Sequence, residues 1–77
     1  MTKLPRITGR QLVAALCKGG FEVIRVKGSH HFMRHPSGKS TVVPVHRGET
    51  IGPGLMSQIL RDCEITREEL IELLKSI

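Results

Sequence analysis

The chain has no aspartate or glutamate between positions 23 and 48. Five basic residues give this segment a charge of +5 before any histidine is protonated: Arg25, Lys27, Arg34, Lys39 and Arg47. Such a segment favours a polyanion as its partner. A charge count alone fits both a nucleic acid and an anionic membrane, but the chain has no basic amphipathic helix, which weighs against the membrane.

Long apolar runs are also missing. No stretch is long enough for a signal peptide or a membrane span, so we expect a cytoplasmic protein. The 77 residues predict one domain, 1–77, with a single core and with any site on its surface. Cysteine is scarce, and Cys17 and Cys63 both fall at apolar positions of predicted helices. We expect two buried, reduced thiols rather than a disulfide.

A capping box marks the first helix. Thr8 and Gln11 have the spacing of this motif, so a helix is predicted at residues 9–18. The pair Gly19-Gly20 ends it, since glycine readily takes the left-handed conformation at a helix end. The predicted buried stripe consists of Leu12, Val13, Leu16 and Cys17.

Two more helices are predicted near the C-terminus. Pro53 suits the first position of one helix. Thr66 and Glu69 form a second capping box and predict a short final helix. The predicted buried face of the helix after Pro53 consists of Leu55, Met56, Ile59, Leu60 and Cys63.

The middle of the chain predicts a three-stranded antiparallel meander. The strands are expected at residues 21–27, 30–35 and 39–45, with turns at Gly28-Ser29 and Pro36-Ser37-Gly38. The apolar alternation slips between Val23 and Ile24, which suggests a bulge, and Pro44 places the third strand at an edge or at its own end. The fold class is therefore α+β: helix, three-stranded sheet, helix and a short C-terminal helix, with one sheet face left open.

The second strand carries three of the four histidines. His30, Phe32 and Arg34 share one face, and the other face carries His31, Met33 and His35. Methionine is the better core residue at the centre of the strand, so the first trio is expected on the open face. A slip of one residue would reverse this assignment.

Four histidines within seventeen positions raise the question of a metal site. His31 and His35 have the spacing that shares a metal on a helix, but on a strand they lie about 13 Å apart. The segment Gly52-Pro53-Gly54 is not a phosphate loop, because its lysine and its serine or threonine are missing. We therefore expect no metal and no cofactor.

Several short motifs together resemble the HicA family of toxins. They are Gly28-Ser29-His30 after a strand, the turn His35-Pro36-Ser37-Gly38, the strand end Val43-Pro44-Val45-His46, and Gly54-Leu55 at the start of a helix that ends in Ile59-Leu60. The resemblance runs from about Thr8 to Leu74. It implies a fold similar to the double-stranded RNA-binding domain, endoribonuclease activity on mRNA, and a HicB antitoxin as partner. It also implies that His30, the histidine after Gly-Ser, is catalytic.

The side chains of this segment also suit RNA cleavage on chemical grounds, apart from the resemblance. RNA cleavage needs a base for the ribose 2′-hydroxyl, charge stabilisation at phosphorus and a proton for the leaving oxygen. His30 suits the base, and Arg25, Lys27 or Lys39 suit the charge stabilisation. His46 is either a second proton-transfer group or a structural histidine. The expected RNA-binding residues are Arg25, Lys27, Gly28, Ser29, Phe32, Arg34, Lys39 and Arg47.

Two interpretations stay open for the basic face. The leading one is a metal-independent endoribonuclease of a toxin–antitoxin system, with RNA and a HicB-type antitoxin as partners. The alternative is a non-catalytic RNA-binding module that uses the same face. Phe32 is either a stacking platform for a base or a core residue.

Overall fold

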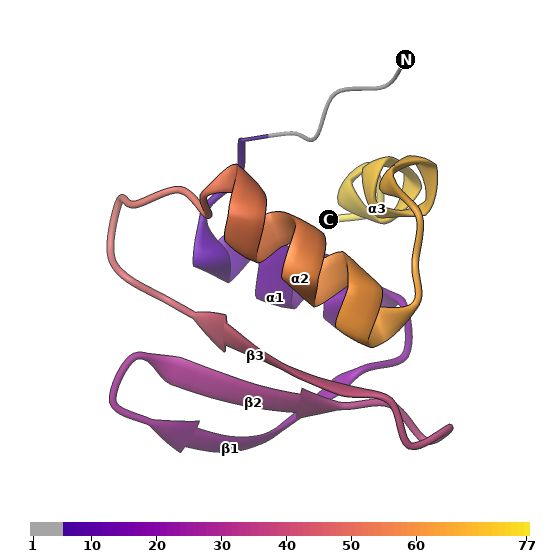
Figure 1. Cartoon of the computed structure of the whole chain (residues 1–77), viewed down its shortest axis with the longest axis horizontal. Helices are drawn as coiled ribbons and strands as arrows, with labels where there is room; N and C mark the ends of the chain where they lie inside the picture. The colour runs from indigo at the N-terminus through magenta and orange to yellow at the C-terminus, as the bar shows by residue number, and fades with distance from the viewer. Residues whose placement is uncertain (1–5) are drawn as a thin grey trace.

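The structure, a computed structural model, describes residues 6–77 (Figure 1). Its elements follow one another as α1 (Gly9–Lys18), β1 (Glu22–Lys27), β2 (His30–Arg34), β3 (Ser40–Pro44), α2 (Pro53–Cys63) and α3 (Arg67–Leu74). The strands form one antiparallel sheet in the order β1-β2-β3. The predicted α+β architecture is therefore confirmed, with the strand ends one residue shorter than expected.

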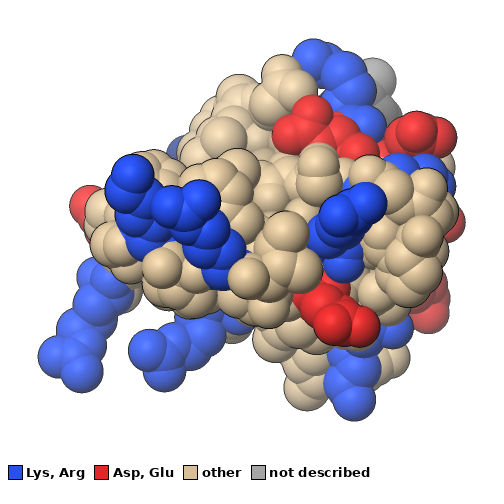
Figure 2. Space-filling view, turned by 90° about the horizontal axis from the view of Figure 1, so that it is seen from below, with Lys and Arg blue, Asp and Glu red and all other residues tan. Residues whose placement is uncertain are grey.

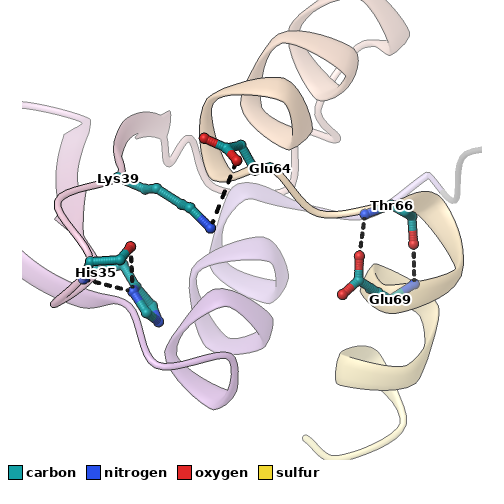
Figure 3. Close-up of polar contacts among 6 residues, drawn as sticks. His35, Lys39, Glu64, Thr66 and Glu69 are labelled. Carbon is teal, nitrogen blue, oxygen red and sulfur yellow. Dashed lines mark hydrogen bonds and ion pairs between the residues drawn. The ribbon is translucent and has the colours of Figure 1, made fainter.

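Both predicted capping boxes are present. In α1 the backbone N–H of Gln11 donates to Thr8 Oγ1 at 3.1 Å, and Gln11 Oε1 accepts from the backbone N–H of Thr8 at 2.9 Å. In α3 the backbone N–H of Thr66 donates to Glu69 Oε1 at 2.8 Å, and that of Glu69 donates to Thr66 Oγ1 at 3.0 Å (Figure 3). These bonds satisfy amides that a helix start leaves without partners.

The register confirms the predicted bulge and the predicted faces. Val23 pairs with Met33, and Arg25 pairs with Phe32, so Ile24 is the extra residue in β1. Met33 is completely buried, while His30 and Arg34 are exposed. We call the sheet side that carries His30, Phe32 and Arg34 the open face.

The helices cover the other side of the sheet unevenly. Figure 1 shows them on one side, with β1 the strand farthest from them; contacts join α1 to β1 and β3, α2 to β3, and α3 to α1. All six residues of β1 are exposed. The core therefore forms between α1, α2 and the inner side of β2 and β3. Its buried apolar residues are Ile7, Leu12, Ala15, Leu16, Phe21, Met33, Val43, Ile51, Met56, Ile59, Leu60, Cys63 and Leu70.

Two predicted core positions are wrong. The buried stripe of α1 runs through Leu12, Ala15 and Leu16, and Cys17 is exposed. Five positions along a helix turn the side chain by about 140°, which carries Cys17 away from Leu12 and the core. Leu55, in the first turn of α2, is 40% exposed. Both cysteines are free thiols, and Cys63 is buried as predicted.

Among residues 6–77, no helix has the length and apolar character that crossing a membrane requires.

Candidate nucleic-acid interface

The β1–β2 hairpin places His30 on the surface. Gly28 has a φ of +60°, a left-handed conformation that suits glycine, and the turn returns the chain so that His30 lies opposite Lys27. On its other side His30 lies opposite Pro44, the last residue of β3. His30 is exposed. We call this end of the sheet, with Lys27, His30 and Pro44, the hairpin end.

An aromatic ring lies beside His30 on the open face. Phe32 is half-buried, and its cross-strand neighbours are Arg25 and Val42. The guanidinium carbon of Arg25 lies 5.7 Å from the centre of the Phe32 ring, within the range of a cation–π contact. Phe32 is therefore not a residue of the buried core, and its ring and Arg25 together offer an apolar and a cationic surface.

His46 follows the hairpin end of β3. The backbone N–H of Val45 donates to the carbonyl of Ser29 at 2.7 Å, which extends the pairing of β2 and β3 beyond Pro44. His46 is the next residue and is exposed in the loop between β3 and α2. It lines a hollow with Thr8, Arg10, Val45, Arg47 and Gly48. The two histidines thus lie at the same end of the sheet.

The opposite end of the sheet, which we call the far end, holds two of the expected RNA-binding residues. Arg34 is the last residue of β2, four positions or about 13 Å from His30. Lys39 precedes β3 at this end, and its Nζ lies 4.0 Å from Glu64 Oε1 (Figure 3). Lys39 therefore does not lie beside His30, contrary to the sequence-based expectation. The backbone N–H of His35 donates to the Lys39 carbonyl across the turn between β2 and β3, so the length of β2 separates Lys39 from His30. The predicted meander already implied this position for Lys39.

His35 and His31 have structural contacts instead. The His35 ring lies 5.1 Å from the Phe21 ring, and its Nδ1 lies 2.8 Å from Ser37 Oγ and 3.0 Å from the Ser37 backbone nitrogen, which donates to it (Figure 3). His31 is half-buried on the helix side, with Nδ1 3.3 Å from the Ser29 carbonyl oxygen. The inward assignment of this trio is confirmed.

Acidic side chains are unevenly distributed between the two ends. Figure 2, seen from the sheet side, shows Lys and Arg side chains at both the left and the right, whereas most of the visible Asp and Glu side chains lie at the right. Arg10, which the sequence did not indicate for this site, lies beside the hairpin end, where it lines the same hollow as His46. The sequence feature that could have indicated Arg10 is its place in a first helical turn that contains no acidic residue.

The histidines of residues 6–77 are not grouped as metal ligands. In this part of the chain no three histidine, cysteine, aspartate or glutamate side chains come together as a group that would hold a metal ion. His31 lies on an extended strand and His35 lies beyond its end, so they do not share a helical face.

The protein is a small α+β domain whose open face carries an exposed histidine, basic side chains and one aromatic ring. Such a surface is suited to a polyanionic ligand. A sequence profile described as the HicA toxin of bacterial toxin–antitoxin systems matches residues 9–65. The chain therefore belongs to the HicA toxin family, as the resemblance of its motifs predicted. Membership in this family implies an antitoxin partner. A comparison with curated proteins finds none that matches.

Proposed function

We propose that this protein is a metal-independent endoribonuclease that cleaves mRNA in the cytoplasm, with His30 as its general base. The observation that carries the proposal is the position of His30, which is exposed on the open face directly after the hairpin turn and opposite Lys27. Family membership adds that the chain is a toxin. An imidazole beside an ammonium group combines proton transfer with stabilisation of a phosphoryl oxygen.

The proposed reaction uses the ribose as the nucleophile. His30 removes the proton of the 2′-hydroxyl, the 2′-oxygen forms a bond to phosphorus, and the bond from phosphorus to the 5′-oxygen breaks. The 5′-oxygen takes a proton from water or from His46, and the products carry a 2′,3′-cyclic phosphate and a 5′-hydroxyl. Proton transfer of this kind contributes roughly 10²–10⁴-fold to the rate. Lys27 and Arg25 stabilise the charge at phosphorus.

The remaining expected residues divide by their position. Gly28 and Ser29 form the turn that presents His30, and Phe32 offers a ring on which an unpaired base stacks. Arg34 lies farther along the open face, and Arg47 lies in the loop after β3. RNA binding should weaken steeply with salt, because neutralised phosphates release counterions.

The test is cleavage of a short RNA in EDTA, with a matched RNA that has one 2′-deoxyribose at the cleavage position. We expect the first to be cut to a 2′,3′-cyclic phosphate and the second to stay intact at that position, because its nucleophile is missing. Binding of both RNAs without cleavage of either would leave the non-catalytic RNA-binding module as the function. Cleavage that EDTA abolishes would contradict metal independence.

We further propose that a HicB-type antitoxin covers the open face and occludes His30. A hollow of about 480 Å³ joins this face to α2, and two exposed apolar side chains line it with Phe32 and Val42: Ile24 of β1 is 59% exposed and Leu55 of α2 is 40% exposed. The basic surface favours an antitoxin with acidic residues. Co-purified complex should lack RNase activity, and removal of the partner should restore it. Full activity of the intact complex would contradict this arrangement.

A further inference from the structure

A second basic hollow lies beside the hairpin end. It has a volume of about 420 Å³ and is bounded by the start of α1 and by the loop after β3. Figure 1 shows these two segments at the same end of the molecule. The side chains that line the hollow include no acid: they are Thr8, Arg10, Val45, His46, Arg47 and Gly48. Two arginines and a histidine thus line one concave surface.

The hollow is held together by the fold. Gly9 is buried against the end of β3, where a side chain would overlap the Pro44 carbonyl oxygen. The backbone N–H of Ile51 donates to the carbonyl of Ile7 at 2.8 Å, and Thr8 and Thr50 form an isolated antiparallel bridge. These contacts fix the first turn of α1 against both ends of the loop. Arg10 and Arg47, which are far apart in the sequence, are therefore brought together by backbone contacts.

The arginines of the hollow have no acidic partner. Among residues 6–77 no ion pair joins an acid to Arg10 or Arg47, and the first turn of α1 contains no acidic residue. Glu49 lines a neighbouring hollow and is not part of the lining here. Guanidinium groups bind phosphate oxygens through paired N–H donors. An anion in the hollow would supply the acceptors that the protein does not.

We propose that this hollow binds a backbone phosphate of the RNA strand that is cleaved at His30. The inference rests on the proposed function, since it takes RNA as the substrate. His30 lies opposite Pro44, and His46 is two residues beyond Pro44, or roughly 7 Å along an extended chain. The hollow is therefore within about one nucleotide spacing of the end of β3 that lies beside His30, and the proposal is that an RNA strand crossing His30 reaches it there. Arg10 and Arg47 bind and position the RNA there, and they do not take part in the bond-breaking step.

The test measures binding of a short single-stranded RNA over a salt series, in a His30→Ala background that prevents cleavage. The variants are Arg10→Gln, Arg47→Gln and the double substitution. Arg61→Gln is the matched control, because it removes the same charge from the exposed side of α2. Each single variant should bind about five- to tenfold more weakly at low salt and lower the salt slope by about 0.7, as expected for one lost phosphate contact on a single strand.

The double variant tests whether the arginines share one phosphate. Residues that hold the same group are not additive, so the double variant should bind little more weakly than either single variant. Additive losses would overturn a shared phosphate, and affinities equal to that of Arg61→Gln would overturn the hollow as an RNA site. Unchanged melting temperatures would confirm that all variants are folded.

Cleavage assays separate this inference from the proposed function. With His30 intact, Arg10→Gln should raise KM with little change in kcat, because it removes binding that is equal in the ground and transition states. Cleavage by the wild type with no effect of Arg10→Gln would overturn the hollow alone. A reduced salt slope without cleavage by any variant would overturn the ribonuclease and support the hollow.

Discussion

The two ends of the sheet use the same kinds of side chain for different purposes. At the hairpin end, His30 and Lys27 are exposed, and the neighbouring hollow contains Arg10 and Arg47 with no acid. At the far end, His35 packs on Phe21 and contacts Ser37, and Lys39 lies 4.0 Å from Glu64. A histidine or a lysine is thus available for a ligand at one end and already has a protein partner at the other.

This difference shows why a count of basic residues does not define a binding surface. Exposed ion pairs contribute little to stability, but they neutralise the field that a polyanion would meet. At the hairpin end, Lys27 and Arg47 come from the acid-free segment between positions 23 and 48, and Arg10 lies in a first helical turn without acids. The far end adjoins the C-terminal helices, which supply Asp62 and Glu64. Proximity to these helices gives Lys39 an acidic partner.

The largest expected effect is the difference in cleavage rate between the alanine variants of His30 and His35. His30→Ala should lower the cleavage rate by roughly two to four orders of magnitude, because it removes the proposed base. Its melting temperature should hardly change, since the side chain is exposed. RNA binding should persist, because the cations remain. Single-turnover cleavage and thermal unfolding measure these outcomes.

His35→Ala is the matched control at the far end. Loss of the contacts with Phe21 and Ser37 should cost about 1–2 kcal/mol of stability. For a domain of this size that lowers Tm by roughly 5–15 °C. Below its Tm the variant should cleave at nearly the wild-type rate. A well-folded His30→Ala protein that cuts RNA at the wild-type rate would remove the catalytic assignment.

Local signals predicted most of the fold. The capping boxes at Thr8 and Thr66, the glycine turn before His30 and the slip near Ile24 all act within a few residues, so sequence spacing was sufficient to find them. The open face was also predictable, because a strand alternates and Met33 is the better core residue.

Contacts between distant segments were not predictable in the same way. Arg10 reaches the candidate interface because Gly9 packs against Pro44, and nothing in the local sequence indicates that pairing. The ion pair of Lys39 is also a contact between distant segments, since Glu64 lies at the C-terminal end of α2. The histidine on the open face could therefore be predicted from sequence, but only part of its cationic surroundings could.

The second prediction tests how firmly the far end is packed. Cys63 is buried beside Asp62, and burial raises the pKa of its thiol from 9.0 to about 11, with Asp62 adding to the rise and Lys39 opposing it. Because burial disfavours the thiolate, its population at pH 8 is about a hundredfold lower than for a thiol of pKa 9.0. Cys17 is exposed. Alkylation of the native protein at pH 8 should therefore modify one thiol quickly, and denaturation should expose the second.

Cys17→Ser is the control for this measurement. It should remove the fast thiol and leave only slow alkylation, whose rate rises as the pH approaches 11. Fast modification of Cys63 in the folded Cys17→Ser protein would show that the far end opens readily. The far end would then not be more firmly packed than the hairpin end.

The smallest expected effect compares two lysines that differ in their partners. Lys27→Gln should weaken RNA binding by roughly tenfold at low salt and reduce the salt slope by about 0.7, because one phosphate contact is lost. Lys39→Gln removes the same charge but leaves Glu64 without its partner, and an exposed pair of this kind is worth about 0–1 kcal/mol. Its RNA affinity should stay close to that of the wild type. Equal losses for the two variants would mean that RNA contacts both ends of the sheet, whereas a loss confined to Lys27→Gln would place the RNA at the end that carries His30.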